Sequence, residues 1–302
     1  MNLKTWFWII LLALLWAPSF LFMKIAVQEI PPFTLAAGRV LLAAIVLTIV
    51  IWQQKLRFPR FGAVWGRFAV LGMFLNVLPY ILISWGEQYV DSGLASLLIG
   101  TDPLFTMVVA HFLIANDRLT PTKMVGVLIG FVGLGLLAAP QLLDGISATV
   151  GGIIAVSLAA LSYGIGGVYA KMYQPKTKPL VTTSAQLWLA LLFLLPVSLL
   201  WERPFTLPTP SLTAVAAIVA LAILCTALTH VIYLWRLRST KVTQLSMIAY
   251  LVPIIGLILG IVVLGEHPSW HALLGGTLIL LGVMIMNGRF SFNSQRRLVG
   301  QQ

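Results

Sequence analysis

The chain has 302 residues, of which 60% are hydrophobic and only 9% are charged, and its mean hydropathy is +1.00. Soluble domains carry roughly 25% charged residues, so this composition excludes a soluble globular protein. The net charge of +11 first suggests a nucleic-acid ligand, but the positions of the charges, given below, favour a membrane protein without a nucleic-acid partner.

Ten apolar runs follow one another along the chain, each of about 20 residues, the length that a bilayer requires of a helix. Most are longer than the strands of a membrane barrel and lack alternation, so we expect helices. The runs lie at 5–27, 33–52, 63–86, 92–114, 120–139, 149–170, 180–200, 211–235, 242–263 and 269–287. They predict an all-α polytopic membrane protein with ten transmembrane helices and no soluble domain.

The first run follows Lys4, as the core of a signal peptide would. Its apolar stretch exceeds the roughly 7–15 residues of such a core, and no small-residue cleavage site follows it. We therefore expect a retained first helix. The single Cys225 can form no internal disulfide and belongs to no metal-ligand set, so we expect it to pack in the core.

Two cations stand inside the first two runs. Arg39 lies about six residues inside the second run, where an unpaired arginine costs a few kcal/mol unless it faces water. It is either a structural or snorkelling residue or an anchor for a substrate carboxylate. Lys24 either snorkels to the interface or serves a substrate site or gate. Trp16 and Phe20 share its helical face and can anchor the interface or contact substrate.

Polar residues recur on one face of the third run and, more weakly, of the eighth. Such a stripe indicates either a water-lined path or hydrogen bonding between helices. The residues are Asn76, Tyr80, Ser84 and Glu87 in the third run and Thr226, His230 and Tyr233 in the eighth.

Asp102 lies deep in the fourth run, beside Pro103. An isolated ionised carboxylate there is costly, so the residue is protonated, paired with Arg39 or Lys24, or lines a cavity. Two roles remain open for it, one in binding substrate or a coupling proton and one in an inert buried ion pair.

The charges outside the runs are unevenly divided between alternate loops. One set of loops holds most cations, namely Lys4, Lys55, Arg57, Arg60, Arg67, Arg118, Lys123, Lys171, Lys176, Lys178, Arg236, Arg238, Lys241, Arg289, Arg296 and Arg297. The other set holds Arg203 with Glu29, Glu87, Asp91, Asp144, Glu202 and Glu266. By the positive-inside rule, this asymmetry predicts a cytoplasmic (inner) membrane protein with both termini in the cytoplasm.

The two halves of the chain are weakly similar. An offset of 147 places 16–24 on 163–171 and pairs Arg39 with Gln186, while an offset of 150 pairs Tyr80 with His230 and Pro103 with Pro253. An offset of 149 pairs two glycines of the fifth run with two of the tenth. The offsets predict a first repeat at 1–145 and a second at 146–302, the latter with a short basic tail. Five helices per repeat require the second repeat to be inverted in the membrane.

Several segments carry a resemblance to a known family: "LLWAPSFLFMKIA", "LAAGRVLLAA", "DPLFTMVVAHFLIANDRLTPTKMVGVLIGFVGLGLL" and "VPIIGLILGIVVLGEHPSWHALLGGTLILLGVMIM". On these segments the chain resembles the drug/metabolite transporter superfamily, in its EamA-type branch of ten-helix exporters. The resemblance implies a central cavity lined by helices one to four and six to nine, with helices five and ten outside. It also implies export of amino acids, other metabolites or drugs. Asp102 departs from the family pattern, in which the residue before that proline is usually uncharged.

These observations predict a secondary transporter that exports a small metabolite, an amino acid or related carboxylate or zwitterion, by alternating access. The alternatives are a multidrug or toxic-compound exporter of the same fold, a channel or scramblase, and an intramembrane enzyme. The sequence shows no P-loop and no cluster of catalytic residues, so we expect neither ATP hydrolysis nor an enzyme. We expect no cofactor and no metal; the partners are a small-molecule substrate, the lipid bilayer and a possible coupling proton. The candidate site consists of Arg39, Lys24, Asp102, Trp16, Phe20, Asn76, Tyr80, Ser84, His230 and Tyr233.

Overall fold

The computed structural model describes residues 3–114, 119–143, 147–173, 177–237, 242–245 and 247–288, and in these ranges it contains helices and loops but no strand. Among the described residues, eight helical segments are long and apolar enough to cross a membrane, judged by length and composition. Two shorter apolar helices follow, Ile248–Leu264 and Trp270–Met286. All ten coincide with predicted apolar runs, so the prediction of an all-helical, multi-pass membrane protein is confirmed.

Several predicted features lie outside the described residues. They are the boundary between 145 and 146, the basic tail 289–302, the N-terminal end, and the charges Arg118, Asp144, Lys176, Arg238, Lys241, Arg289, Arg296 and Arg297.

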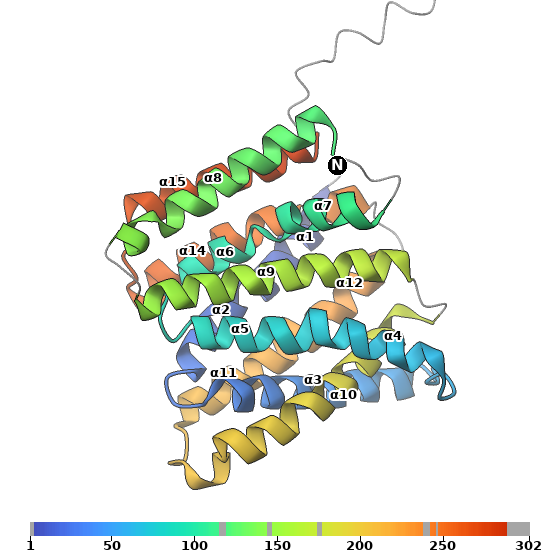
Figure 1. Ribbon diagram of the computed structural model, residues 1–302. Coiled ribbons are helices and arrows are strands. Elements are labelled where there is room, and N and C mark those ends of the chain that lie inside the picture. The colour runs from blue at the N-terminus through green and yellow to red at the C-terminus, as the bar shows by residue number, and fades with distance from the viewer. Residues whose placement is uncertain are drawn as a thin grey trace, which may run out of the picture.

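The described residues of the first half form eight α-helices and one π-helical turn (Figure 1). They are α1 (Leu3–Trp16), α2 (Pro18–Ala26), α3 (Pro32–Gln53), α4 (Ala63–Gly72), the turn Met73–Val77, α5 (Leu78–Gly86), α6 (Ser92–Ile99), α7 (Asp102–Leu113) and α8 (Pro121–Leu143).

The described residues of the second half also combine continuous and interrupted helices. It contains α9 (Ala148–Met172), α10 (Pro179–Val197), the π-helical turn Ser198–Glu202, a 3₁₀ turn (Pro204–Thr206), α11 (Leu212–Ala222), the π-helical turn Ile223–Leu228, α12 (Thr229–Leu237), α13 (Val242–Leu245), α14 (Ile248–Leu264) and α15 (Trp270–Met286).

Prolines mark several of the interruptions. Pro18 opens α2, Pro79 follows the first π-helical turn, and Pro103 stands at the start of α7 after the break between α6 and α7. A proline inside a helix removes one backbone donor and leaves a carbonyl without its usual partner, so the helix bends or changes its hydrogen bonding there. The first, third and fourth spans are therefore interrupted near the middle.

The helices pack side by side in a bundle (Figure 1). The main contacts join α8 to α15, α3 to α10, α5 to α9, α7 to α9, α6 to α14 and α2 to α11. The α8–α15 pair stands along one edge and approaches closely through glycines. A Cβ atom added at Gly126 would lie 2.6 Å from the carbonyl oxygen of Gly282, and one at Gly133 would lie 2.6 Å from that of Gly275. Close helix packing through small residues is common in membranes.

Three glutamates cap the N-termini of helices from other parts of the chain. Glu202 accepts hydrogen bonds from the backbone of Phe33 and Thr34 at the start of α3, at 2.9 and 2.6 Å. Glu266 accepts from Ser92 and Gly93 at the start of α6, at 2.7 and 2.9 Å. Glu29 accepts from the backbone of Ser211 before α11, at 2.6 Å. These helices start on the left in Figure 1, and we name this side of the bundle the carboxylate-capped end. A carboxylate there offsets the partial positive charge of a helix N-terminus.

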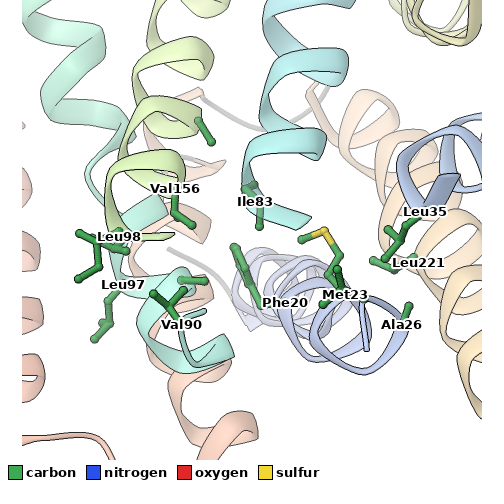
Figure 2. Close-up of a cluster of buried hydrophobic side chains, with 14 of the residues drawn as sticks. Phe20, Met23, Ala26, Leu35, Ile83, Val90, Leu97, Leu98, Val156 and Leu221 are labelled. Atoms are coloured by element: carbon green, nitrogen blue, oxygen red, sulfur yellow. The ribbon is translucent and has the colours of Figure 1, made fainter. Parts of the chain in front are cut away.

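A dense apolar core fills the bundle near the carboxylate-capped end. Figure 2 shows Phe20, Met23 and Ala26 of α2 among Leu35, Ile83, Val90, Leu97, Leu98, Val156 and Leu221, all of them buried. The side chains come from α2, α3, α6, α9 and α11 and from α5 with the loop after it. The interdigitation of so many elements closes this end of the molecule.

Candidate functional site

A cavity of about 670 Å³ lies between the helices. Its lining side chains come from α1–α3, α5–α7, α9, α10, α12–α14 and the first π-helical turn, and in the described part of the chain α8 and α15 contribute none. This agrees with the arrangement that the resemblance implies, in which the fifth and tenth spans stand outside. Eight of the ten predicted site residues line the cavity: Trp16, Phe20, Arg39, Asn76, Tyr80, Asp102, His230 and Tyr233.

The cavity extends from the middle of the bundle away from the carboxylate-capped end. Ala170, Thr183 and Leu234 line it near the ends of their spans that face the opposite side. Toward the carboxylate-capped end, the lining includes Met23 and Ile83, and the buried core described above lies beyond them. The structure therefore holds a cavity that is closed at the carboxylate-capped end.

Arg39 of α3 is the buried cation of this cavity, with 4% of its surface exposed. Its Nε donates to the Thr226 hydroxyl at 2.9 Å, and one terminal nitrogen contacts the Met23 sulfur at 3.5 Å. The guanidinium lies over the Tyr80 ring, 3.9 Å from its centroid. Among the described residues no carboxylate forms an ion pair with it. Weak, neutral contacts hold the side chain in place and leave guanidinium donors for a ligand.

Thr226 and His230 determine which hydrogen-bond donors and acceptors lie beside Arg39. The Thr226 hydroxyl donates to the Leu221 carbonyl at 2.8 Å, so the interaction with Arg39 uses it as an acceptor. Nδ1 of His230 lies 2.6 Å from the Thr226 carbonyl. Because a carbonyl only accepts, Nδ1 carries a hydrogen, and in the neutral ring Nε2 is left as an acceptor.

Asp102 is the first residue of α7 and also lines the cavity. The Thr106 hydroxyl donates to its Oδ1 at 3.0 Å. A carboxylate in the first turn of a helix is stabilised by the positive end of the helix dipole. The break between α6 and α7 thus places an acidic group, with one hydrogen bond and a favourable dipole, at the wall of the cavity in the middle of the bundle.

Aromatic side chains form much of the remaining wall. The ring of Trp16 packs edge-on against His230, with centroids 6.0 Å apart, and 5.6 Å from the ring of Tyr233. Phe20 lies one turn further along the first span and also joins the buried core (Figure 2). Asn76 in the first π-helical turn adds an amide to the lining. The wall can therefore contact both apolar and polar parts of a ligand.

Lys24 and Ser84 lie beyond the cavity, toward the carboxylate-capped end. The Lys24 ammonium donates to the backbone carbonyls of Glu87 and Val90, each at 2.7 Å. Ser84 is fully buried, and its hydroxyl contacts the Met23 sulfur at 3.7 Å. The predicted polar stripe is thus divided, because Asn76 and Tyr80 reach the cavity whereas Ser84 and Glu87 are enclosed by protein.

The structure adds two polar residues that the candidate site omitted, Tyr163 of α9 and Gln186 of α10. The offset of 147 between the halves pairs Tyr163 with Trp16 and Gln186 with Arg39. The weak similarity between the two halves was therefore the signal that could have found both, since the positions that this offset pairs line the same cavity.

Comparison with known proteins gives one family. The EamA-like transporter family matches residues 3–139 and 150–288. The chain is 28% identical to the probable amino-acid metabolite efflux pump of Salmonella typhimurium, across 99% of this chain and 100% of that one. It is 27% identical to the probable terminal-alkyne amino-acid exporter of Streptantibioticus cattleyicolor, across 96% and 95%. It is 29% identical to a transporter of Archaeoglobus fulgidus, across 96% and 99%.

A solved crystal structure has a similar fold, with a TM-score of 0.65 over 94% of this chain and 97% of that one at 19% identity. At that identity the likeness concerns the fold alone. The family match covers nearly the whole chain in two parts, one in each half, and the fold and central cavity agree with it. The chain therefore belongs to the EamA-like transporter family and is a multi-pass membrane transporter rather than an enzyme.

Proposed function

We propose that the protein is a secondary transporter that exports an amino acid or a related zwitterionic carboxylate across the cytoplasmic membrane by alternating access. The observation that carries the proposal is the buried Arg39 at the cavity, which has no carboxylate partner among the described residues. A buried cation is costly without an anion, and a substrate carboxylate supplies one. Planar guanidinium binds carboxylate through two parallel hydrogen bonds.

The charges of the cavity favour a zwitterion over a simple anion. Among its described lining residues, Arg39 is the basic one and Asp102 the acidic one, with His230 as a further polar group. In this proposal Arg39 binds the carboxylate, and Asp102 binds the amino group or exchanges a coupling proton. Trp16, Phe20 and Tyr233 pack against the substrate side chain, while Asn76, Tyr80 and His230 supply hydrogen bonds. Lys24 and Ser84 support the site from outside the cavity.

We further propose ten transmembrane helices arranged as two inverted five-helix repeats, 1–145 and 146–302. The packing supports this. The second, fourth and fifth spans each contact the corresponding span of the other repeat, in the pairs α3–α10, α6–α14 and α8–α15. Two further contacts, α2–α11 and α5–α9, exchange places under the same symmetry, since they join the first span of one repeat to the third of the other.

The glycines of α8 and α15 support the same symmetry. The sequence offset pairs Gly126 with Gly275 and Gly133 with Gly282, whereas in space Gly126 meets Gly282 and Gly133 meets Gly275. A reciprocal contact of this kind is what a two-fold axis between equivalent elements produces. The π-helical turns at Met73–Val77 and Ile223–Leu228 also fall on equivalent positions at an offset of 150.

With the proposed topology, the carboxylate-capped end is extracytoplasmic and both termini are cytoplasmic. The cavity, closed at that end and extended toward the other, then belongs to an inward-facing state that can load substrate from the cytoplasm. The names of two relatives, a probable terminal-alkyne amino-acid exporter and a probable amino-acid metabolite efflux pump, support this direction and substrate class. The aromatic wall favours a second candidate, a multidrug or toxic-compound exporter of the same fold.

The first prediction tests Arg39. Proteoliposomes containing the purified protein are loaded with a mixture of labelled amino acids, and release is followed by mass spectrometry. Arg39→Lys keeps the charge but loses the planar fork, so we expect the release of the transported amino acids to fall about tenfold, as for the loss of one charge-assisted hydrogen bond. Arg57→Lys, in an exposed loop, is the matched control and should retain wild-type release.

Two outcomes would contradict the proposal. Equal release by Arg39→Lys and wild type would make Arg39 structural. Release of hydrophobic organic cations, with no release of any amino acid, would favour the multidrug exporter.

A further inference from the structure

Glu87 follows α5 directly and is fully buried. Among the described residues neither of its carboxylate oxygens has a hydrogen-bond partner. The other glutamates of the carboxylate-capped end differ sharply, because Glu29, Glu202 and Glu266 each accept at least two hydrogen bonds from helix N-termini and hydroxyls. A carboxylate removed from water without donors is strongly disfavoured in its ionised form.

The charged groups around Glu87 come from several elements. Lys24 on α2 and Arg39 on α3 attract a negative charge there, whereas Glu266, after α14, repels it. Asp91 lies in the same loop, and the charges of Lys24 and Glu266 also act on its carboxylate. Burial outweighs the attraction of Lys24, so the pKa of Glu87 is raised well above its ordinary value. The ionised form of the carboxyl group is therefore disfavoured in this closed arrangement.

Glu87 occupies the layer that separates the cavity from the carboxylate-capped end. Ile83, which lines the cavity, stands one helical turn before it on α5, and Met23, also at the cavity, directly precedes Lys24. The Lys24 ammonium holds the carbonyls of Glu87 and Val90, so it ties α2 to the end of α5. If a path opened here from the cavity to this end, the hydrogen bonds of Lys24 to these carbonyls would break and Glu87 would be exposed to water.

We propose that Glu87 is a proton-binding site that latches the carboxylate-capped end, so that closure takes up one proton and opening releases it. The proposal rests on the alternating access proposed above. It differs from coupling at Asp102, because Asp102 faces the cavity whereas Glu87 is enclosed on both sides in the closed arrangement.

The sign of the effect follows from the two states. In the open state Glu87 is hydrated and its pKa is near the ordinary value of about 4.3, while in the closed state it is raised. Between these two pKa values the closed state holds one more proton, so acid favours closure. The ratio of open to closed molecules should rise up to about tenfold for each unit of pH in that interval.

The test measures opening without any transported substrate. Ser96 lines the cavity, and a Ser96→Cys reporter is placed in a Cys225→Ala background. A membrane-impermeant maleimide is added outside intact cells from pH 5 to pH 8, and the labelling rate is measured with Glu87 and with Glu87→Gln. Glutamine imitates the protonated acid, and the ratio of the two rates cancels the titration of the reporter thiol.

We expect the Glu87 to Glu87→Gln ratio to be lowest at pH 5 and to rise at least tenfold toward pH 8. Glu29→Gln is the matched control at the same end, because hydrogen bonds from Ser211 lower the pKa of the exposed Glu29 and keep it ionised throughout this range. That control should retain the pH profile of the background protein.

Two results would overturn the proposal, and they are distinct. A pH-independent ratio, with Ser96→Cys labelled from outside, would remove Glu87 as the latch and leave alternating access intact. No labelling from outside at any pH, with labelling in permeabilised cells, would show that this end does not open and would contradict the proposed transport cycle as well.

Discussion

Arg39 is a cation inside the bundle, and its contacts explain how the protein tolerates it. The Tyr80 ring lies under the guanidinium, and Thr226 accepts from Nε. Neither contact neutralises the charge, so both orient it for an anion. Thr226 is already committed as a donor to Leu221, which makes its hydroxyl oxygen a fixed acceptor for Arg39. Thr226 is therefore a residue that positions Arg39 in the proposed site.

A second prediction follows for Thr226. Thr226→Val keeps the shape but leaves the Arg39 Nε–H without its acceptor, at a cost of about 1–3 kcal/mol for a buried donor. We expect KM for the transported amino acid to rise about tenfold in the proteoliposome assay while kcat changes less. Thr226→Ser retains the hydroxyl and should restore KM. An unchanged KM in Thr226→Val would show that Arg39 needs no orientation from this residue.

At the scale of elements, interrupted helices build the cavity and continuous helices brace it. The π-helical turn at Met73–Val77 brings Asn76 to the cavity, and the break before Asp102 brings a helix N-terminus there. In contrast, α8 and α15 are paired with each other through their glycines. We expect the stability of that pair to depend on close backbone approach rather than on apolar area, because lipid is as apolar as the side chains.

The third prediction tests this packing with two glycines of α8. A Cβ at Gly133 would lie 2.6 Å from the Gly275 carbonyl oxygen, whereas at Gly135 nothing lies within 4 Å. Gly133→Ala should therefore destabilise the protein by about 1–3 kcal/mol and lower Tm in detergent by several degrees. Gly135→Ala should leave Tm unchanged or raise it, since alanine favours helix. Equal Tm values for the two variants would contradict the close α8–α15 contact.

At the scale of the whole molecule, three carboxylate caps join distant parts of the chain at one end. Glu29 reaches α11, Glu202 reaches α3 and Glu266 reaches α6. Each cap ties the start of a helix in one half of the chain to an acidic residue in the other half. The arrangement stabilises the closure of this end, and the Glu87 latch would operate inside the same layer.

The last prediction concerns topology. Gln54 and Gln88 are exposed residues just after α3 and α5, two spans that run in opposite directions. In a Cys225→Ala background, Gln88→Cys should react with an impermeant maleimide added outside intact cells, and Gln54→Cys should react only after permeabilisation. Labelling of both from the same side would contradict the proposed topology. Reversed sidedness would place both termini outside and make the cavity outward-facing.

The sequence alone determined the class of the protein, because apolar runs of bilayer length can satisfy their backbone hydrogen bonds only as helices. It also identified most of the cavity lining, since charges such as Arg39 and Asp102 are too costly to face lipid. It could not separate Lys24 from Arg39, which look alike in a linear chain. Their positions depend on which neighbours surround each side chain: carbonyls at the end of α5 hold the ammonium of Lys24, while an aromatic ring and a hydroxyl leave Arg39 at the cavity.

The tertiary structure alone decided the place of Glu87. In the sequence it continues a polar helical stripe and stands beside a loop of acidic residues, which suggests a hydrated surface. Burial is a property of all the elements that pack around a residue, and here α2, α5 and the helices around them enclose the carboxylate without offering a donor among the described residues. The energetic cost of ionising a carboxylate enclosed in this way arises only when the chain is folded.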